Sequence, residues 1–185
     1  MKRVAILASH NGSGFVALYE ALQRGEISIE IPLVISNNSN AQVLQNAAAY
    51  GIDNFVINSK TADAPDEKIE QLLYEYECNY IFLSGYMKKV GENITKNFQV
   101  INSHPALLPN YGGAGMYGRF VHEAVIKNRE KQSGVTIHIV NDRYDEGEII
   151  LQRKLLLTQN ESVESLETKI KELEQITIVE AFKNI

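Results

Sequence analysis

The sequence is short of several features, and each shortage excludes a class of protein. One cysteine, Cys78, is present in 185 residues, so no disulfide can form within the chain. No apolar run approaches the roughly 20 residues that cross a bilayer, and the apolar start at 3–8 is too short for a signal peptide. Lys and Arg number 18 against 23 Asp and Glu, so no basic field draws the chain to nucleic acid or lipid. We therefore expect a cytoplasmic protein with small-molecule substrates and no nucleic-acid or membrane partner.

The length and the composition predict one compact domain over residues 1–185. Hydrophobic residues make up 44% and charged residues 22%, which is the balance of a globular protein. A chain of 185 residues is close to one average domain and buries about 70% of the surface that its unfolded form exposes. A sizeable core is therefore expected to form without a disulfide.

Hydrophobic periodicity predicts an α/β fold with a doubly wound, mostly parallel sheet. Short apolar runs alternate with longer segments of helical period as far as residue 128, which is typical of βαβ units. The period then changes to two, which predicts a C-terminal antiparallel strand pair before a closing helix. The expected strands are 3–8, 31–36, 55–57, 80–83, 100–102, 135–140 and 148–154. The expected helices are 15–24, 41–50, 65–77, 90–98, 120–128 and 163–182.

The turn that follows the first expected strand is rich in small residues. It reads Ser9-His10-Asn11-Gly12-Ser13-Gly14, directly before a helix. Small residues let an anion approach the backbone closely, and the N–H groups that open the helix point toward that anion. This predicts a phosphate site, although many strand-to-helix turns carry glycine and serine for structural reasons alone. The turn lacks the full G-x-G-x-x-G pattern, so no nicotinamide cofactor is expected.

An asparagine and a histidine lie two residues apart at the end of the fifth expected strand. Because side chains alternate along a strand, Asn102 and His104 point to the same side. An amide can stabilise a developing oxyanion while an imidazole moves protons near neutral pH, which is what acyl transfer needs. The alternative is a histidine that is only hydrogen-bonded at a strand end.

The polar loop 141–147 joins the two strands of the expected antiparallel pair. Asp145 becomes functional only if the fold brings it to His104, where a carboxylate would raise the pKa of the imidazole and orient the ring. In that case we expect His104 to titrate above a free imidazole. The alternative is a solvent-exposed loop without a specific role. The histidines show no metal-site spacing, so no metal is expected.

Four segments resemble the glycinamide ribonucleotide formyltransferase family. The segment 101–109, I-N-S-H-P-A-L-L-P, is similar to the family's I-N-x-H-P-[SA]-L-L-P. G-V-T-I-H at 134–138 and Y-D-E-G at 144–147 are similar to its G-x-[ST]-x-H strand and L-D-x-G loop. L-S-G-Y-M-K at 83–88 is similar to L-A-G-[FY]-M-R. The resemblance covers essentially the whole chain, and motifs at the right intervals are far more specific together than singly.

The resemblance implies an enzyme that transfers the formyl group of its co-substrate 10-formyltetrahydrofolate to the amine of 5-phosphoribosyl-glycinamide in purine biosynthesis. It implies a phosphate-binding half at about 1–100 and a catalytic and folate-binding half at about 101–185. Asn102, His104 and Asp145 would be the catalytic residues, with Asn102 and protonated His104 on the oxyanion. We expect a monomer or a homodimer.

The resemblance also implies the ligand contacts. The phosphate of the ribonucleotide would be held by Asn11, Gly12, Ser13 and Gly14. The folate would lie against Met87, Lys88, Lys89, Val90, Asn102, Asn141 and Asp142. Glu174 in the last helix aligns with a family glutamate near the glycinamide, and the alternative is an exposed helical acid.

The sequence departs from the family pattern at the turn and near residue 60. The family turn reads S-G-x-G-[ST]-N, so His10 replaces a glycine and Gly14 replaces an asparagine. The segment 58–67 is short and acidic, and the basic residue that the family supplies there for its ligands is not evident. Gln175 stands where a histidine is common. The altered turn keeps open a formyltransferase with another acceptor, such as an amino-sugar nucleotide, and a formyl-folate hydrolase that uses water.

Two further classes fit the sequence less well. Methionyl-tRNA formyltransferase shares the domain and the motifs, but it needs an additional nucleic-acid-binding domain that 185 acidic residues cannot contain. A non-enzymatic ligand-binding relative has no need of a proton-transfer pair, whereas Asn102, His104 and Asp145 are intact.

Overall fold

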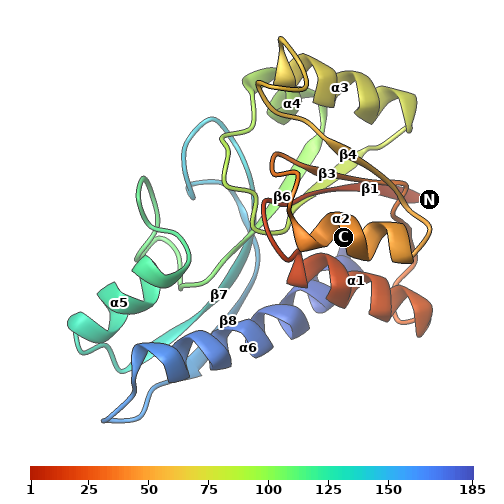
Figure 1. Cartoon of the computed structure of the whole chain (residues 1–185). Coiled ribbons are helices and arrows are strands. Elements are labelled where there is room, and N and C mark those ends of the chain that lie inside the picture. The colour runs from red at the N-terminus through yellow and green to blue at the C-terminus, as the bar shows by residue number, and fades with distance from the viewer. The chain divides into compact units, whose positions relative to one another are not determined.

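A computed structural model describes all residues from 1 to 185, and the chain divides into two compact units. The first unit is Met1–Ile101 and the second is Asn102–Ile185. Figure 1 shows the helices and strands of both units, coloured along the chain.

Parallel strands form the centre of the first unit. Their order is β4 (Asp53–Val56), β3 (Leu33–Ser36), β1 (Lys2–Leu7) and β5 (Tyr80–Leu83), and the short β2 (Ile29–Glu30) also pairs with β1. All these pairings are parallel, and Ile6 of β1 lies opposite Val34 on one side and Phe82 on the other. Residues 4–7 of β1 have no exposed surface. Continuous apolar runs of this kind are typical of parallel strands that helices cover on both faces.

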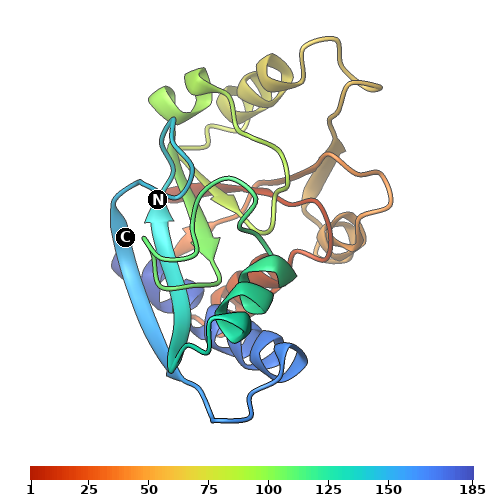
Figure 2. The same cartoon turned by 90° about the vertical axis from the view of Figure 1, so that its left-hand side faces the viewer.

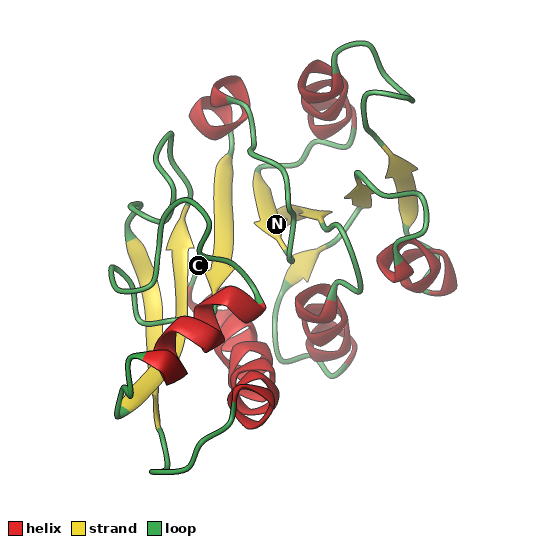
Figure 3. Cartoon of the chain, turned by 60° about the vertical axis from the view of Figure 1, so that its left-hand side comes forward, coloured by secondary structure: helices red, strands yellow, loops and turns green.

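Four helices cover these strands. They are α1 (Ser13–Gln23), α2 (Gln42–Ala49), α3 (Pro65–Glu75) and α4 (Glu92–Asn97). In Figure 1 and Figure 3, α1 and α2 lie on one side of the strands, while α3 and α4 lie on the other. Proline at the first position of α3, followed by Asp66 and Glu67, favours a helix start, because the missing N–H needs no partner there and acids interact well with the helix dipole.

An antiparallel strand pair and two helices make up most of the second unit. Strand β6 (Gln99–His104) enters this unit with its last three residues. Helix α5 (Arg119–Lys127), strands β7 (Gln132–Ile139) and β8 (Ile149–Leu156) and helix α6 (Val163–Asn184) follow. Figure 2 shows β7 and β8 side by side, paired from Gln132 opposite Leu156 to His138 opposite Ile149. Helix α6 packs against both strands and against α5.

A buried hydroxyl ties the loop after β6 to the strand pair. Thr136 of β7 has no exposed surface, and its Oγ1 donates to the carbonyl of Ala106 at 2.7 Å. The same oxygen accepts the N–H of Leu108 at 3.1 Å and an amide N–H of Gln152 at 2.8 Å. A hydroxyl offers one donor and two acceptor sites, so Thr136 is fully satisfied. The loop that follows His104 is thereby fixed to β7.

The predicted architecture is confirmed: parallel strands with helices, then an antiparallel pair and a closing helix. Every expected strand and helix is present, and the largest shift of an end is three residues, at the start of β7 (132 instead of 135). Only the two-residue β2 was not expected. None of the helices combines the length and the apolar composition that crossing a membrane requires.

Candidate active site

Strand β6 delivers Asn102 and His104 to the second unit. Asn102 Nδ2 lies 3.2 Å from Nε2 of His138, and His104 Nε2 lies 2.7 Å from the main-chain oxygen of Tyr111. A carbonyl oxygen only accepts, so Nε2 of His104 carries the hydrogen. In the neutral ring, Nδ1 of His104 is therefore the nitrogen with the free lone pair.

Asp145 lies between two imidazoles. Its Oδ2 is 3.6 Å from Nδ1 of His104, and its Oδ1 is 3.5 Å from Nε2 of His138. The main-chain N–H of Gly113 donates to Oδ2 at 2.9 Å. The side chains of His104 and Asp145 are only 4% and 13% exposed, so water screens their interaction weakly. The structure thus brings Asp145 to His104, which is the condition on which its expected role depends.

Backbone geometry places the Asp145 loop close to β7. Asp145 has a φ of 57°, in the left-handed region that aspartate tolerates better than most residues. A Cβ at Gly147 would overlap the carbonyl oxygen of Ile139, so only glycine fits there. The glycine of the Y-D-E-G motif therefore serves the close approach of the loop to β7, and the aspartate faces the imidazoles.

His138 was not among the expected site residues. Its side chain is 2% exposed, and its Nδ1 donates to the carbonyl of Ile139 at 2.9 Å. With that hydrogen on Nδ1, Nε2 of a neutral His138 ring accepts from the amide of Asn102, whereas Nε2 of a protonated ring donates toward Oδ1 of Asp145. A register shift in the β7–β8 pairing falls between Ile137 and His138, and such irregularities re-aim side chains near functional sites. The histidine of the G-x-[ST]-x-H motif was the sequence signal for this residue.

Burial decides the charge of His104. It lowers the pKa of His104 below its ordinary value, and the opposing effects of the Asp145 carboxylate and the Tyr111 carbonyl do not offset it. The expectation that His104 titrates above a free imidazole is therefore wrong, because it considered the carboxylate without the loss of solvent. The resting imidazole is neutral at neutral pH.

Asp145 remains ionised although it is partly buried. Burial alone raises the pKa of Asp145, but its interactions with His138 and His104 and the N–H of Gly113 outweigh burial and lower it. A carboxylate that stays charged beside a neutral imidazole stabilises the imidazolium that forms when His104 takes up a proton.

A further histidine, His122 of α5, is buried without a hydrogen-bond partner for its Nδ1 atom. Burial lowers the pKa of His122, and the charge of Glu167 opposes this effect without cancelling it. His122 is therefore a neutral core residue at neutral pH.

Glu174 of α6 is held by the strand that carries Asn102 and His104. Ser103 Oγ donates to Oε1 of Glu174 at 2.5 Å. Burial raises the pKa of Glu174, and the hydrogen bond from Ser103 offsets only part of that rise. The alternative of a free, exposed helical acid does not hold.

The turn 9–14 is a tight connection in the first unit. Gly12 has a φ of 64°, and a Cβ there would overlap Cγ2 of Val43, so glycine is required. The main-chain N–H of Phe15 donates to Oγ of Ser84 at 3.1 Å and is not free for a ligand. The side chains of His10, Asn11 and Ser13 are exposed, whereas Gly14 is buried.

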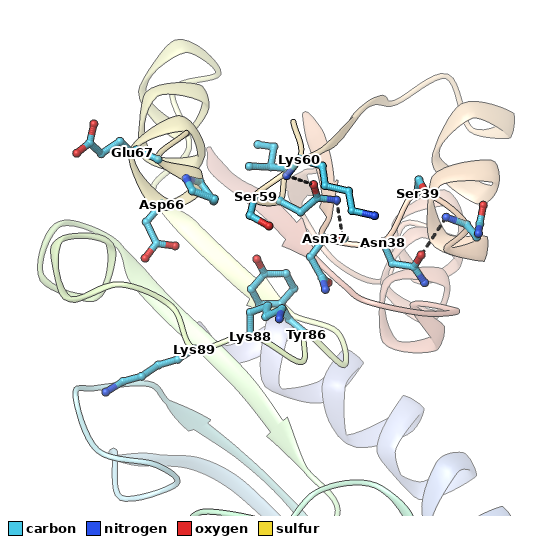
Figure 4. Close-up of a pocket in the computed structure, with 15 residues that line it drawn as sticks. Asn37, Asn38, Ser39, Ser59, Lys60, Asp66, Glu67, Tyr86, Lys88 and Lys89 are labelled. Atoms are coloured by element: carbon cyan, nitrogen blue, oxygen red, sulfur yellow. Dashed lines mark hydrogen bonds between the residues drawn. The ribbon is translucent and has the colours of Figure 1, made fainter. Parts of the chain in front are cut away.

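A pocket of about 910 Å³ opens in the first unit. Figure 4 shows Lys60 among the upper lining residues and Lys89 at the lower left, with Tyr86 between them and Asp66 at the left. Lys60 lies within 58–67, the segment in which the basic residue of the family pattern was not evident, and it lines this pocket. The sequence signal for Lys60 was a lysine inside an acidic segment. Its position at the pocket follows only from the fold.

The expected folate contacts separate into two groups. Lys88 and Lys89 line the pocket, and Met87 and Val90 do not. The N–H of Met87 donates to Oγ of Ser9 at 2.8 Å and its side chain is exposed. Val90 is 7% exposed, so its side chain belongs to the core.

Asn141 and Asp142, also expected at the folate, are exposed residues of the second unit. The side chain of Asn141 accepts the N–H of Arg143 at 2.9 Å and so caps its own loop. No group of three or more His, Cys, Asp or Glu side chains is arranged to hold a metal ion.

In this α/β fold, an amide, two imidazoles and a carboxylate lie in one cluster, an arrangement that suits acid–base chemistry on a carbonyl group. The chain belongs to the formyl transferase family, whose model matches residues 2–182.

Individual relatives agree with this assignment. The chain is 30% identical over 179 residues to the phosphoribosylglycinamide formyltransferase of Bacillus subtilis, covering 94% of this chain and 89% of that protein. It is 32% identical over 175 residues to the chloroplastic enzyme of that name from Vigna unguiculata, covering 91% of this chain and 56% of that protein. The crystal structure of glycinamide ribonucleotide transformylase 1 from Symbiobacterium toebii matches with a TM-score of 0.91 at 28% identity, over 99% of this chain and 86% of that one. The chain thus spans less than two thirds of the plant protein and most of the bacterial ones.

Proposed function

We propose that this chain transfers the formyl group of 10-formyltetrahydrofolate to the primary amine of 5-phosphoribosyl-glycinamide. The observation that carries this proposal is the buried His104–Asp145 pair beside Asn102, in a chain of the formyl transferase family. The names of the relatives support the choice of the glycinamide ribonucleotide as acceptor.

The reaction forms one C–N bond and breaks another. The neutral amine attacks the formyl carbon, and the carbonyl oxygen becomes an oxyanion. The amine nitrogen loses a proton, N10 of the folate gains one, and the bond between N10 and the formyl carbon then breaks. The protein has to stabilise the oxyanion and move one proton between two nitrogens.

Asn102 is suited to the oxyanion. A side-chain amide has two N–H donors, and one of them reaches Nε2 of His138. The second donor is left for the substrate. Because His138 fixes the plane of the amide, this donor is already oriented when the oxyanion forms, which is the requirement for electrostatic stabilisation of a transition state.

His104 is suited to move the proton. Its neutral ring has the free lone pair on Nδ1, so it first accepts the proton that the attacking amine loses. The imidazolium that results faces Oδ2 of Asp145 at 3.6 Å. His104 then returns the proton to N10, and it becomes cationic only while the oxyanion exists.

Two features of the first unit suit the ends of the substrates. Lys60 and Lys88 line a pocket, and their cationic side chains suit the glutamyl carboxylates of the folate. The turn 11–14 at the start of α1, where Asn11 and Ser13 are exposed, suits the phosphate of the ribonucleotide, because N–H groups and the positive end of a helix favour anions.

A transfer assay with a panel of amines tests the proposal. Purified protein is given 10-formyltetrahydrofolate with glycinamide ribonucleotide, an amino-sugar nucleotide or water alone, and both loss of the formyl-folate and formation of the formylated amine are measured. We expect formylated glycinamide ribonucleotide and little loss with water. Equal loss with and without the ribonucleotide would identify a formyl-folate hydrolase and refute the proposal.

A further inference from the structure

The backbone of 111–113 touches both members of the His104–Asp145 pair. The carbonyl of Tyr111 accepts from His104 Nε2 at 2.7 Å, and the N–H of Gly113 donates to Oδ2 of Asp145 at 2.9 Å. A Cβ at Gly112 would come within 2.6 Å of Leu108 Cδ2 and 3.1 Å of Asp145 Cβ. The segment therefore passes so close to the pair that its path sets the geometry of both residues.

Tyr111 adopts a conformation that tyrosine does not favour. Its φ is 57°, in the left-handed region where a bulky residue is an outlier. Such conformations persist only when the surrounding structure holds them, and they cluster at functional sites. The carbonyl of this same residue points at His104.

The phenol of Tyr111 supplies that hold. Its hydroxyl donates to Oε1 of Glu130 at 2.7 Å and accepts from Nδ2 of Asn128 at 2.9 Å. Asn128 and Glu130 follow directly after α5 and belong to the turn that leads into β7. The next residues, 112–116, are glycine, alanine and methionine, which offer no comparable polar anchor.

We infer that Tyr111 is a positioning residue whose phenol, fixed by Asn128 and Glu130, holds its own carbonyl against His104 and so sets which ring nitrogen carries the hydrogen. The role in catalysis rests on the proposed function, because only a proton-transferring His104 needs a defined tautomer. With the hydrogen on Nε2, the lone pair of Nδ1 faces Asp145. With the hydrogen on Nδ1, the nitrogen that accepts a proton would face the carbonyl of Tyr111 instead.

The test removes the phenol oxygen and reads the tautomer directly. Ring ¹⁵N chemical shifts of His104, assigned by their loss in His104→Gln, report the nitrogen that bears the hydrogen. We expect the Nε2–H form in the unmodified protein and a substantial Nδ1–H fraction in Tyr111→Phe. Turnover should fall roughly 5- to 30-fold, the effect of one lost hydrogen bond, while KM changes by less than about twofold.

Two further variants separate positioning from general damage. Glu130→Gln keeps an oxygen acceptor for the phenol and should preserve both tautomer and turnover. Tyr117→Phe alters an exposed tyrosine of the same loop and is the matched control. An unchanged tautomer in Tyr111→Phe overturns the inference, whatever happens to turnover. A shifted tautomer in a protein that transfers no formyl group supports the positioning of His104 and refutes the proposed function.

Discussion

Replacing Asp145 by asparagine tests the centre of the site with little change of shape. The variant removes a charge 3.6 Å from Nδ1 of His104, in a place where the two side chains are 13% and 4% exposed. Coulomb's law with an effective dielectric constant of about 20 gives an attraction of about 4–5 kcal/mol between the carboxylate and the imidazolium.

The attraction exists only when His104 is protonated, so its loss acts on the transition state and not on substrate binding. We expect turnover in Asp145→Asn to fall by roughly 10²- to 10³-fold with KM nearly unchanged. Because Asp145 opposes the effect of burial, the pKa of His104 should also fall further below its ordinary value, which an NMR titration of the ring measures.

Glu146→Gln is the matched control, because it neutralises an exposed acid in the same loop. Its turnover should stay within about twofold of the unmodified protein, since exposed charges contribute little. Turnover of Asp145→Asn within threefold of the control, or a His104 titration that does not move, would remove Asp145 from the mechanism.

Three other perturbations probe the framework of the site. Thr136→Val leaves buried donors and acceptors unpaired and should lower the free energy of unfolding by about 2–4 kcal/mol in urea titration, whereas Thr136→Ser should cost about 1 kcal/mol. Gly12→Ala should lower the free energy of unfolding more than Gly25→Ala, because both residues have a positive φ but only Gly12 lacks space for a Cβ atom. Calorimetry should also show that Gly12→Ala weakens binding of the ribonucleotide. The folded state resists protonation of His122 because burial lowers its pKa, so the free energy of unfolding should fall from about pH 7.5 to about pH 5.5, and His122→Gln should flatten that slope.

Each of these predictions has a contradicting outcome. Equal stability of the valine and serine variants at 136 would mean that the hydroxyl is not needed there. Equal effects of alanine at 12 and 25 would remove the steric argument for the turn. A pH slope that His122→Gln leaves unchanged would place the responsible group elsewhere.

Most of the fold could be predicted from the sequence because its signals are local. The apolar run at 80–83 coincides with β5, and proline with two acids marks the start of α3 at residue 65. The two-residue β2 could not be predicted, because such a short strand has no periodicity and depends on pairing with β1.

The site could be predicted only in part. The alternation along β6 places Asn102 and His104 together, whereas the approach of Asp145 depends on loop geometry that its sequence does not encode locally. The lowered pKa of His104 depends on burial by distant segments, so a prediction from the neighbouring carboxylate alone has the wrong sign. The motif marks His138 in the sequence, but its position beside Asp145 follows a register shift in the β7–β8 pairing that the residue pattern does not show.

The close contact at Gly147 also allows relatives of this chain to be distinguished by the residue that they carry at this position. A side chain at this position cannot coexist with the carbonyl of Ile139, so a relative with another residue there must carry its loop farther from β7. Its aspartate two positions earlier would then be present in the sequence yet displaced from the imidazole. The residue at position 147 therefore separates relatives whose loop can hold the aspartate beside the imidazoles from relatives that have the aspartate without this contact.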